Sequence, residues 1–449
     1  MNLNDINFIS CFFSIIAIYY RISKIMVEKE MVGSTEKKRD YITPVLVFSL
    51  SYSIYCIIGF SDHAFSSFYS IYDKIVFAFS FVIGLIFFLL GYGIDNSISN
   101  NIKKNTSSKI TTNNIFNRKI SIVELALWGI FFLSIILFRD KFFSRIVNFG
   151  TGASYLDYSI RMERTSSTGL LSALSSYFTL TILVLPFYRV WKFKKAHLLD
   201  VFIFVIIFSY SFFSGDRTNL VLGVFLIAVS INNRYKKINM STIIIGFSIS
   251  LFFFILIGHL RRYNSIDDML LLVKREGINE LLQLDSSGEF KYTTQTLLDY
   301  IHSINSKKMN FNFGYTYVIE LLMLIPTFIF PNRPKPLNEQ YMNIFYPDAI
   351  SGTGHAWFIL TDGYMSFGII GIAFEMLIYG KIIKLIYKKF FECNHTPIRD
   401  YLYSYFLLYV FYSIRSSMVL TLKNYIISIA PILVFLFLIK KYEKEDYYD

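Results

Sequence analysis

Long apolar stretches, separated by short polar connections, follow one another along the whole chain. A helix needs about 20 predominantly apolar residues to cross the hydrocarbon core of a bilayer, and the pattern reaches or approaches this length repeatedly. We therefore expect an all-α polytopic membrane protein with about eleven transmembrane helices. They are expected near residues 3–20, 41–60, 72–94, 120–138, 168–188, 198–214, 218–232, 241–259, 357–380, 400–418 and 424–439.

Lys and Arg residues gather in alternate connections, which together hold more than half of the 44 basic residues. Basic connections stay on the cytoplasmic side of a membrane, so the pattern predicts an outer N-terminus and an inner C-terminus. The basic connections are 21–39, 103–119, 189–195, 234–237, 381–399 and 440–444. Topology therefore accounts for most of the net charge of +12, which does not indicate nucleic-acid binding.

This orientation places residues 259–356 on the outer face. Two stretches in this region, 267–284 and 294–304, repeat apolar residues near the helical period, which is typical of amphipathic helices. We expect both helices to lie on the outer membrane surface. The apolar run Tyr315–Phe330 would export the basic segment 381–389 if it crossed the membrane, so we expect a re-entrant or surface-lying helix there.

The composition agrees with a membrane protein, because 54% of the residues are hydrophobic and 17% are charged. Cys11, Cys56 and Cys393 are scattered and give no pattern of disulfides or metal ligands. We expect three parts: an N-terminal transmembrane bundle of about eight helices (1–258), an outer helical region (259–356) and about three C-terminal transmembrane helices (357–449).

A short polar break, Ser214–Thr218, lies between two apolar runs and contains Asp216 and Arg217. The flanking runs keep both charges close to a bilayer surface. An ionisable residue at membrane depth is costly and usually marks a pathway or a binding site. We expect an anionic ligand if Arg217 is the working residue.

The predicted outer face holds several further cations that the orientation rule would not place there. Guanidinium groups bind phosphate oxygens in a bidentate fork, so their convergence at headgroup depth would suit a diphosphate. The alternative is that they contact lipid phosphates or pair with acidic neighbours. The outer cations are Arg161, Arg164, Arg217, Arg261, Arg262, Arg333 and Lys335.

His355 lies at the predicted outer mouth of a span and follows Gly352 and Gly354. An imidazole titrates near neutral pH and is a candidate general base, although an interfacial histidine can also be a hydrogen-bonded anchor. Asp362, seven residues further on, would lie about two helical turns deeper on the same helix face and could orient the imidazole through a bridging group. We expect the glycines after Asp362 to allow close helix packing. These are Gly363, Gly368 and Gly371.

Aromatic residues of the outer region have two interpretations: they anchor the protein at the interface or they stack on sugar rings. The residues concerned are Tyr300, Tyr315, Tyr317, Tyr341, Tyr346 and Trp357.

Three features together resemble the bacterial O-antigen polymerase (Wzy-type) family of oligosaccharide repeat-unit polymerases. They are the Gly215–Arg217 hairpin, the outer Pro331–Pro336 run, and the His355 segment that leads into Phe367–Gly371. The resemblance implies a GT-C-like membrane glycosyltransferase that needs no cofactor and no metal. It would transfer a glycan from undecaprenyl diphosphate to the next lipid-linked repeat unit, on the outer face of the bacterial cytoplasmic membrane, and so build O-antigen or capsule.

The resemblance also implies roles for individual residues. Arg217 and His355 would be catalytic, with Asp216 and Asp362 in support. The diphosphate would be bound by Arg217, Arg261, Arg333, Lys335, Arg161 and Arg164. Implied partners are undecaprenyl-diphosphate-linked glycans, membrane lipids, a chain-length regulator and a flippase. An O-antigen ligase and a flippase or transporter of lipid-linked oligosaccharide remain as alternative functions.

Overall fold

The computed structural model describes residues 42–64, 66–93, 187, 198, 201–206, 217–235, 237–239, 241–243, 245–246, 271, 274–275, 289–325, 329–348, 355–391 and 397–445. Throughout these ranges the regular structure is helical and no strand occurs, which confirms the expected all-α class. The helices are α2 (Pro44–Ala64), α3 (Ile71–Gly93), α10 (Arg217–Ser230), α14 (Glu289–Asn305), α15 (Tyr315–Leu322), α16 (Leu337–Phe345), α17 (Thr361–Phe390), α18 (Pro397–Tyr412) and α19 (Met418–Glu445). A π-helical turn, Ile231–Tyr235, follows α10, and a 3-10 turn, Ser413–Arg415, follows α18.

Six of the predicted spans coincide with helices, namely α2, α3, α10, α17, α18 and α19. The other five windows lie wholly or mostly outside the described residues, so the total of about eleven stays a prediction. Within the described part, α3 is the one helix that is both long and apolar enough to cross a membrane. Shorter apolar stretches occur at Pro44–Phe60, Val221–Asn233 and Met418–Ala430.

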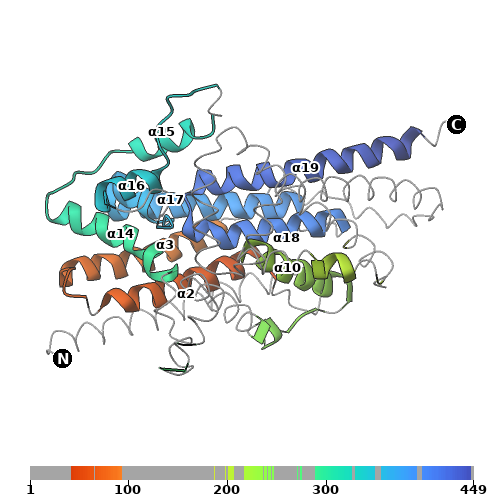
Figure 1. The fold of residues 1–449 in the computed structure, drawn as a ribbon, viewed down its shortest axis with the longest axis horizontal. Helices are drawn as coiled ribbons and strands as arrows, with labels where there is room; N and C mark the ends of the chain where they lie inside the picture. The colour runs from red at the N-terminus through yellow and green to blue at the C-terminus, as the bar shows by residue number, and fades with distance from the viewer. Residues whose placement is uncertain are drawn as a thin grey trace.

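The long helices lie side by side, and α14, α15 and α16 gather at one end of the bundle (Figure 1). We call this the α14 end. There, His63 at the end of α2 contacts the Lys291 carbonyl of α14 at 3.2 Å. The opposite end carries basic residues of α17, including Lys384, whose ammonium lies 4.7 Å from the ring centre of Tyr92.

Glycine allows α3 and α17 to pack in backbone contact. A Cβ atom on Gly91 of α3 would lie 2.0 Å from the Leu377 carbonyl oxygen, and one on Gly380 of α17 would lie 2.2 Å from the Phe88 carbonyl oxygen. Both distances are far below van der Waals contact. The two helices therefore approach closely only because these positions lack a side chain.

We expect Gly91→Ala to lower the thermal unfolding temperature, because the new methyl group must push α3 and α17 apart. Overpacking of this kind costs about 1–3 kcal/mol. Gly246→Ala is the matched control, since a Cβ there meets no heavy atom within 4 Å. Thermal unfolding of the two variants in detergent would test this; equal unfolding temperatures would contradict the close contact.

Helix α17 has a kink near its start. Phe367 and Gly368 are not helical, and Gly368 has φ +64° and ψ −143°, a conformation that favours glycine. The first turns of α17 fold back on the next, so that a Cβ on Gly371 would lie 2.1 Å from the Gly363 carbonyl oxygen. The predicted close packing is found at Gly363 and Gly371, where the contact lies within α17 itself, whereas a Cβ on Gly368 would meet only Phe311 at 3.4 Å.

The predicted helix at 294–304 is confirmed by α14, but its expected position on the membrane surface is wrong. Residues Thr293, Thr294 and Thr296 to Ile301 are buried, because α14 packs against α2, α3 and α17. The second predicted amphipathic helix, 267–284, lies outside the described residues apart from three positions. In the apolar run 315–330, α15 has only eight residues, too few to span a bilayer.

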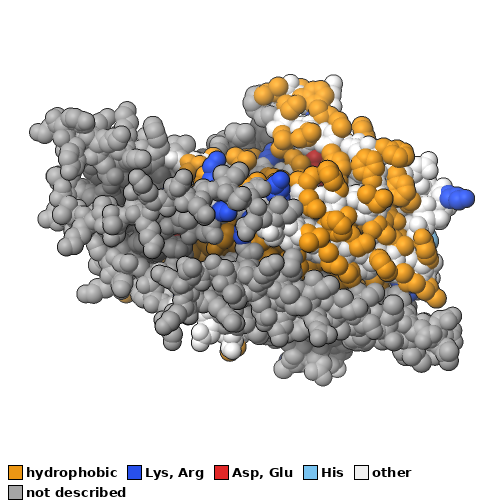
Figure 2. Space-filling model, turned by 180° about the vertical axis from the view of Figure 1, so that it is seen from behind, with side chains coloured by type: hydrophobic (Ala, Val, Ile, Leu, Met, Phe, Trp, Pro, Cys, Tyr) orange, Lys and Arg blue, Asp and Glu red, His pale blue; other side chains and the backbone are white. Residues whose placement is uncertain are grey.

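Large apolar side chains are exposed over one broad face (Figure 2). They belong mainly to α3, α15 and α17, and an apolar surface of this extent marks contact with a membrane or a partner. Exposed apolar residues of these three helices include Tyr72, Ile75, Phe79, Tyr315, Val318, Leu321, Phe367, Ile370 and Phe374.

Candidate active site

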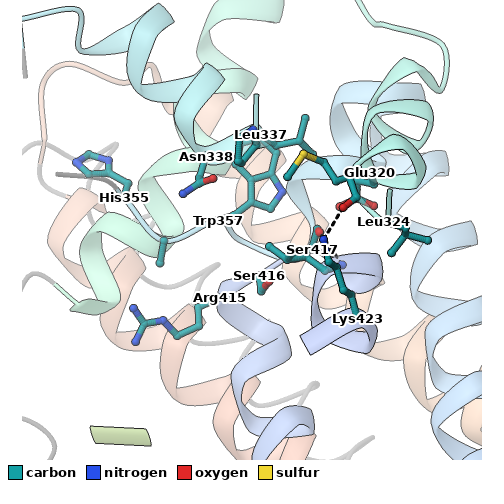
Figure 3. Close-up of a pocket in the computed structure, with 14 residues that line it drawn as sticks. Glu320, Leu324, Leu337, Asn338, His355, Trp357, Arg415, Ser416, Ser417 and Lys423 are labelled. Carbon is teal, nitrogen blue, oxygen red and sulfur yellow. Dashed lines mark hydrogen bonds between the residues drawn. The ribbon is translucent and has the colours of Figure 1, made fainter. Parts of the chain in front are cut away.

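A cavity of about 280 Å³ lies at the α14 end (Figure 3). This volume is close to the lower end of ligand-binding pockets, about 300 Å³. Its wall is formed by α15, by the start of α16, by the segment before α17, and by the junction of α18 and α19. The lining residues are Glu320, Met323, Leu324, Pro336, Leu337, Asn338, His355, Ala356, Trp357, Arg415, Ser416, Ser417, Leu420 and Lys423.

The junction of α18 and α19 brings three polar residues to the cavity. The 3-10 turn ends at Arg415, Ser416 is extended, and Ser417 caps α19 by accepting a hydrogen bond from the Leu420 amide at 3.3 Å. The Ile359 amide donates to the Ile414 carbonyl at 3.1 Å. This bond holds the junction against the segment that carries His355.

Three cations lie at or beside the cavity. Arg415 and Lys423 line it, and both side chains are half-buried. Arg333 does not line it, but its Nη1 donates to the Met323 carbonyl at 3.4 Å and to the Ile325 carbonyl at 3.0 Å. The Lys423 Nζ donates to the same Met323 carbonyl at 2.5 Å. Arg333 and Lys423 are thus neighbours, and their positive charges act on each other.

The N-terminus of α19 adds to this positive field. Helix N-termini carry partial positive charge and free amide groups, and Ser416, Ser417 and Leu420 of this first turn line the cavity together with Lys423. The arrangement of Arg415, Lys423 and the start of α19 is suited to a bound anion.

His355 lies between aromatic rings at the edge of the cavity. Its ring centre is 4.5 Å from that of Tyr292 and 4.7 Å from that of Tyr346, and its Nδ1 is 3.3 Å from the Tyr341 hydroxyl. Burial, together with the nearby charge of His63, lowers the pKa of His355 to about 4. The imidazole is therefore neutral near pH 7, as a proton acceptor must be.

Asp362 does not orient His355 in the way that helical spacing predicts. His355 precedes α17, which begins at Thr361, so the two residues do not share a helix face. The Asp362 Oδ1 instead accepts a hydrogen bond from Trp357 Nε1 at 2.8 Å, and its side chain is fully buried.

Three buried carboxyl groups lie near one another, one in the cavity wall and two behind it. Glu320 lines the cavity, while Asp362 and Glu375 lie deeper, and all three act electrostatically on one another. The Tyr317 hydroxyl donates to Glu375 Oε2 at 3.1 Å. In the part of the chain that the structure describes, no group of acidic, histidine or cysteine side chains has the arrangement of a metal site.

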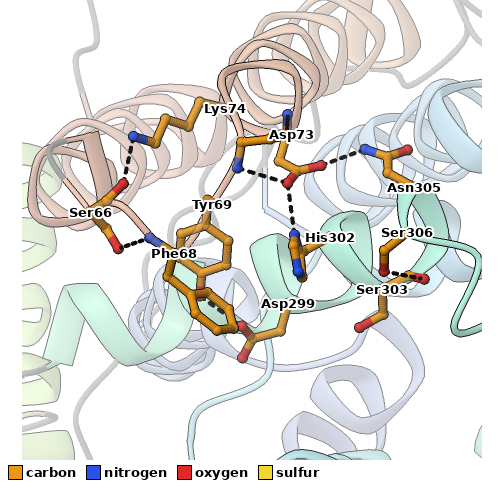
Figure 4. Close-up of polar contacts among 11 residues, drawn as sticks. Ser66, Phe68, Tyr69, Asp73, Lys74, Asp299, His302, Ser303, Asn305 and Ser306 are labelled. Atoms are coloured by element: carbon orange, nitrogen blue, oxygen red, sulfur yellow. Dashed lines mark hydrogen bonds and ion pairs between the residues drawn. The ribbon is translucent and has the colours of Figure 1, made fainter.

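A second polar cluster joins α3 to α14 (Figure 4). Ser70 and Asp73 form a capping box at the start of α3, with reciprocal hydrogen bonds of 3.1 Å. The Asp73 carboxylate also contacts His302 Nδ1 at 2.9 Å and accepts from Asn305 Nδ2 at 2.7 Å. This cluster fixes α14, and with it the residues around His355, against the bundle.

The structure brings some predicted site residues together and leaves others apart. His355 lines the cavity and Arg333 lies beside it, whereas Lys335 is exposed and pairs with Glu339 at 2.7 Å. Arg161, Arg164, Asp216 and Arg261 lie outside the described residues, so their roles stay predictions.

Arg217 is the first residue of α10, and its side chain is not described. Helix α10 packs on α18, and just beyond its end Asn233 Nδ2 donates to Asp400 Oδ1 near the start of α18, at 3.0 Å. The two helices therefore run antiparallel. The start of α10 lies toward the Arg415 end of α18, which is the end that faces the cavity.

Sequence reasoning missed Arg415 and Lys423. For Arg415 the sequence signal is the same as at Arg217, since Ser413–Ser417 is a mostly polar break with one arginine between two apolar runs. Asp299, which is linked to His355 through Tyr341, gave no such signal, and Tyr341 was noted only as an aromatic residue of the outer region.

A sequence model of one family, described as O-antigen polysaccharide polymerase Wzy, matches residues 2–445. No curated protein and no solved structure matches the chain.

Proposed function

Because the chain belongs to the O-antigen polysaccharide polymerase family, which joins lipid-linked repeat units in the inner membrane, we propose that the cavity at the α14 end is its polymerisation site. The family match favours this polymerase over the ligase and flippase alternatives. One observation carries the proposal: a single cavity gathers His355, Arg415 and Lys423.

The cations hold the diphosphate of the donor lipid. Arg415 supplies a planar fork for phosphate oxygens, and Lys423 and the start of α19 add positive charge. Arg333 lies beside Lys423 and Arg217 lies toward the same end, so both extend the field. Arg161, Arg164, Arg261 and Lys335 make outer contacts to the diphosphate or to lipid headgroups, and Asp216 supports Arg217. Asp362 does not act on His355, but it supports Trp357 of the cavity wall through the bond from Trp357 Nε1.

His355 takes the proton of the acceptor. The acceptor hydroxyl oxygen attacks the anomeric carbon of the donor glycan's reducing-end sugar, and the bond from that carbon to the diphosphate oxygen breaks. The electron pair leaves with undecaprenyl diphosphate, whose growing negative charge is stabilised by the cations. The proton of the attacking hydroxyl passes to the neutral imidazole.

The cavity opens on the outer face of the inner membrane. The protein is GT-C-like and has about eleven spans. Its three parts are the N-terminal bundle (1–258), the outer region (259–356) and the C-terminal spans (357–449). One observation supports this orientation, and a second supports the position in a membrane. The basic residues of α17, including Lys384, lie at the end opposite the cavity, where the positive-inside rule places the cytoplasm. The exposed apolar face over α3, α15 and α17 is suited to lipid. A chain-length regulator and a flippase would act beside this site.

We expect Arg217→Ala to abolish chain extension in cells that lack their own polymerase, because the diphosphate site loses one of its cations. Surface polysaccharide would then carry single repeat units, which ladder gels detect directly. Lys237→Ala, beyond the π-helical turn that follows α10, is the control and should leave the ladder intact. A normal ladder with Arg217→Ala would remove this residue from the mechanism.

A further inference from the structure

The carboxylate of Asp299 accepts three phenolic hydrogen bonds. Its Oδ1 accepts from Tyr69 at 2.7 Å (Figure 4), and its Oδ2 accepts from Tyr341 at 2.5 Å and from Tyr346 at 3.2 Å. Asp299 is buried in α14, which raises its pKa, while the bonds from Tyr341, Tyr69 and Tyr346 oppose that shift by favouring the ionised form. Each of the three phenols thus gives its single proton to Asp299, and the Tyr346 oxygen in addition accepts from Gln295 Nε2 at 2.6 Å.

The protons of this cluster determine the state of His355. A phenol has one proton, and Tyr341 gives it to Asp299 Oδ2, which at 2.5 Å is nearer than His355 Nδ1. The Tyr341 oxygen can then only accept from His355, whose Nδ1 lies 3.3 Å away. In the neutral imidazole one nitrogen carries the hydrogen and the other is the acceptor, so Nδ1 carries the hydrogen and Nε2 has the free lone pair.

We propose that Asp299 and Tyr341 are positioning residues that hold His355 in the tautomer with Nε2 as the proton acceptor. This inference rests on the proposed role of His355 in polymerisation. The chain from Asp299 through Tyr341 to His355 does the work that a carboxylate alone does in a catalytic triad, where it fixes the tautomer and the ring orientation without taking the proton. Stacking on Tyr292 and contact with Tyr346 fix the plane of the ring.

Tyr69 provides a matched control for Tyr341. Both residues donate one hydroxyl to Asp299 and both side chains are buried, with exposed fractions of 5% and 0%. Only Tyr341 also contacts His355 in the described structure. Tyr341→Phe and Tyr69→Phe therefore each remove one phenolic hydrogen bond to Asp299, but only the first breaks the link to the imidazole.

The test uses the purified full chain and lipid-linked repeat units extracted from cells that lack the polymerase. Tyr341→Phe should lower kcat by at least about 10²-fold with KM changed less than about threefold, since the wrong tautomer in a triad costs up to about 10⁴-fold. Tyr69→Phe should stay within about threefold of the wild type. Equal losses in the two variants, or a change in KM alone, would overturn the proposal.

Asp299→Asn is the second variant and keeps the test decisive if Tyr341→Phe does not fold. The amide can donate to the Tyr341 oxygen, which turns the Tyr341 hydroxyl toward His355 Nδ1 and moves the imidazole hydrogen to Nε2. The kcat should then fall by the same factor at every pH between 6 and 8, because a tautomer ratio does not depend on pH. A merely structural role would instead expose His355 and produce a new loss of activity below its ordinary pKa of 6.5.

The His355→Ala variant separates the positioning role of Asp299 and Tyr341 from the proposed polymerisation site. Full activity in His355→Ala would contradict both. An inactive His355→Ala together with active Tyr341→Phe and Asp299→Asn would leave the polymerisation site in place and remove only the positioning role.

Discussion

Arg415→Ala is expected to abolish chain extension while the protein still folds and still enters the membrane. Arg415 lies in the turn between α18 and α19 and lines the cavity together with Lys423. Among the described residues, Arg415 is the arginine that lines this cavity, so its planar guanidinium can take up the charge that develops on the departing diphosphate. Removing one donor from such a site typically costs about 10²–10³-fold in kcat.

Two further variants separate charge from geometry at this position. Arg415→Lys keeps the positive charge but loses the bidentate fork, so its activity should lie between those of the wild type and the alanine variant. Arg399→Ala removes an exposed arginine near the opposite end of α18 and should retain full activity. Release of undecaprenyl diphosphate from extracted lipid-linked repeat units measures all three. Unchanged release by Arg415→Ala would exclude this residue from the diphosphate site.

His355→Ala is expected to lower kcat by about 10²–10⁴-fold, the usual contribution of a general base. His355→Gln keeps a hydrogen-bonding side chain without a base in this pH range, so it should be equally inactive if proton transfer is the role. The two alternatives for His355 are thereby separated, because a hydrogen-bonded anchor would be largely rescued by glutamine. Polymer length on gels and the rate of diphosphate release are the measurements.

The pH dependence of the wild type gives an independent check. The neutral imidazole is the active form, and a pKa of about 4 keeps it neutral well below pH 6. The rate should therefore stay level as the pH falls from 7.5 to 5.5, and it should be lost only as the pH approaches the pKa. A decline centred near 6.5, the ordinary pKa of a histidine, would show that the ring is solvated in the working enzyme.

The apolar windows predicted the long helices well, because a span depends on local composition. The windows at 41–60 and 72–94 correspond closely to α2 and α3. The position of α14 could not be predicted in the same way. Its apolar face packs on α2 and α3 instead of on lipid, and a pattern of apolar positions does not say which apolar partner covers them.

The candidate site was predictable only where one short segment carried the signal. His355 and the cation Arg333 were found because each lies in an unusual local sequence. Asp362 was chosen as the supporting carboxylate on helical spacing, but α17 begins after His355. The carboxylate that is linked to His355, through the Tyr341 hydroxyl, is Asp299, more than 50 residues earlier in the chain, and tertiary packing alone brings it there.

The most direct measurement is a structure of the full chain with undecaprenyl diphosphate, the product that leaves the reaction, bound to it. We expect the two phosphates in the cavity, with oxygens about 3 Å from the Arg415 guanidinium and next to Lys423. A diphosphate held elsewhere on the protein, with Arg415 and Lys423 free of it, would contradict the account.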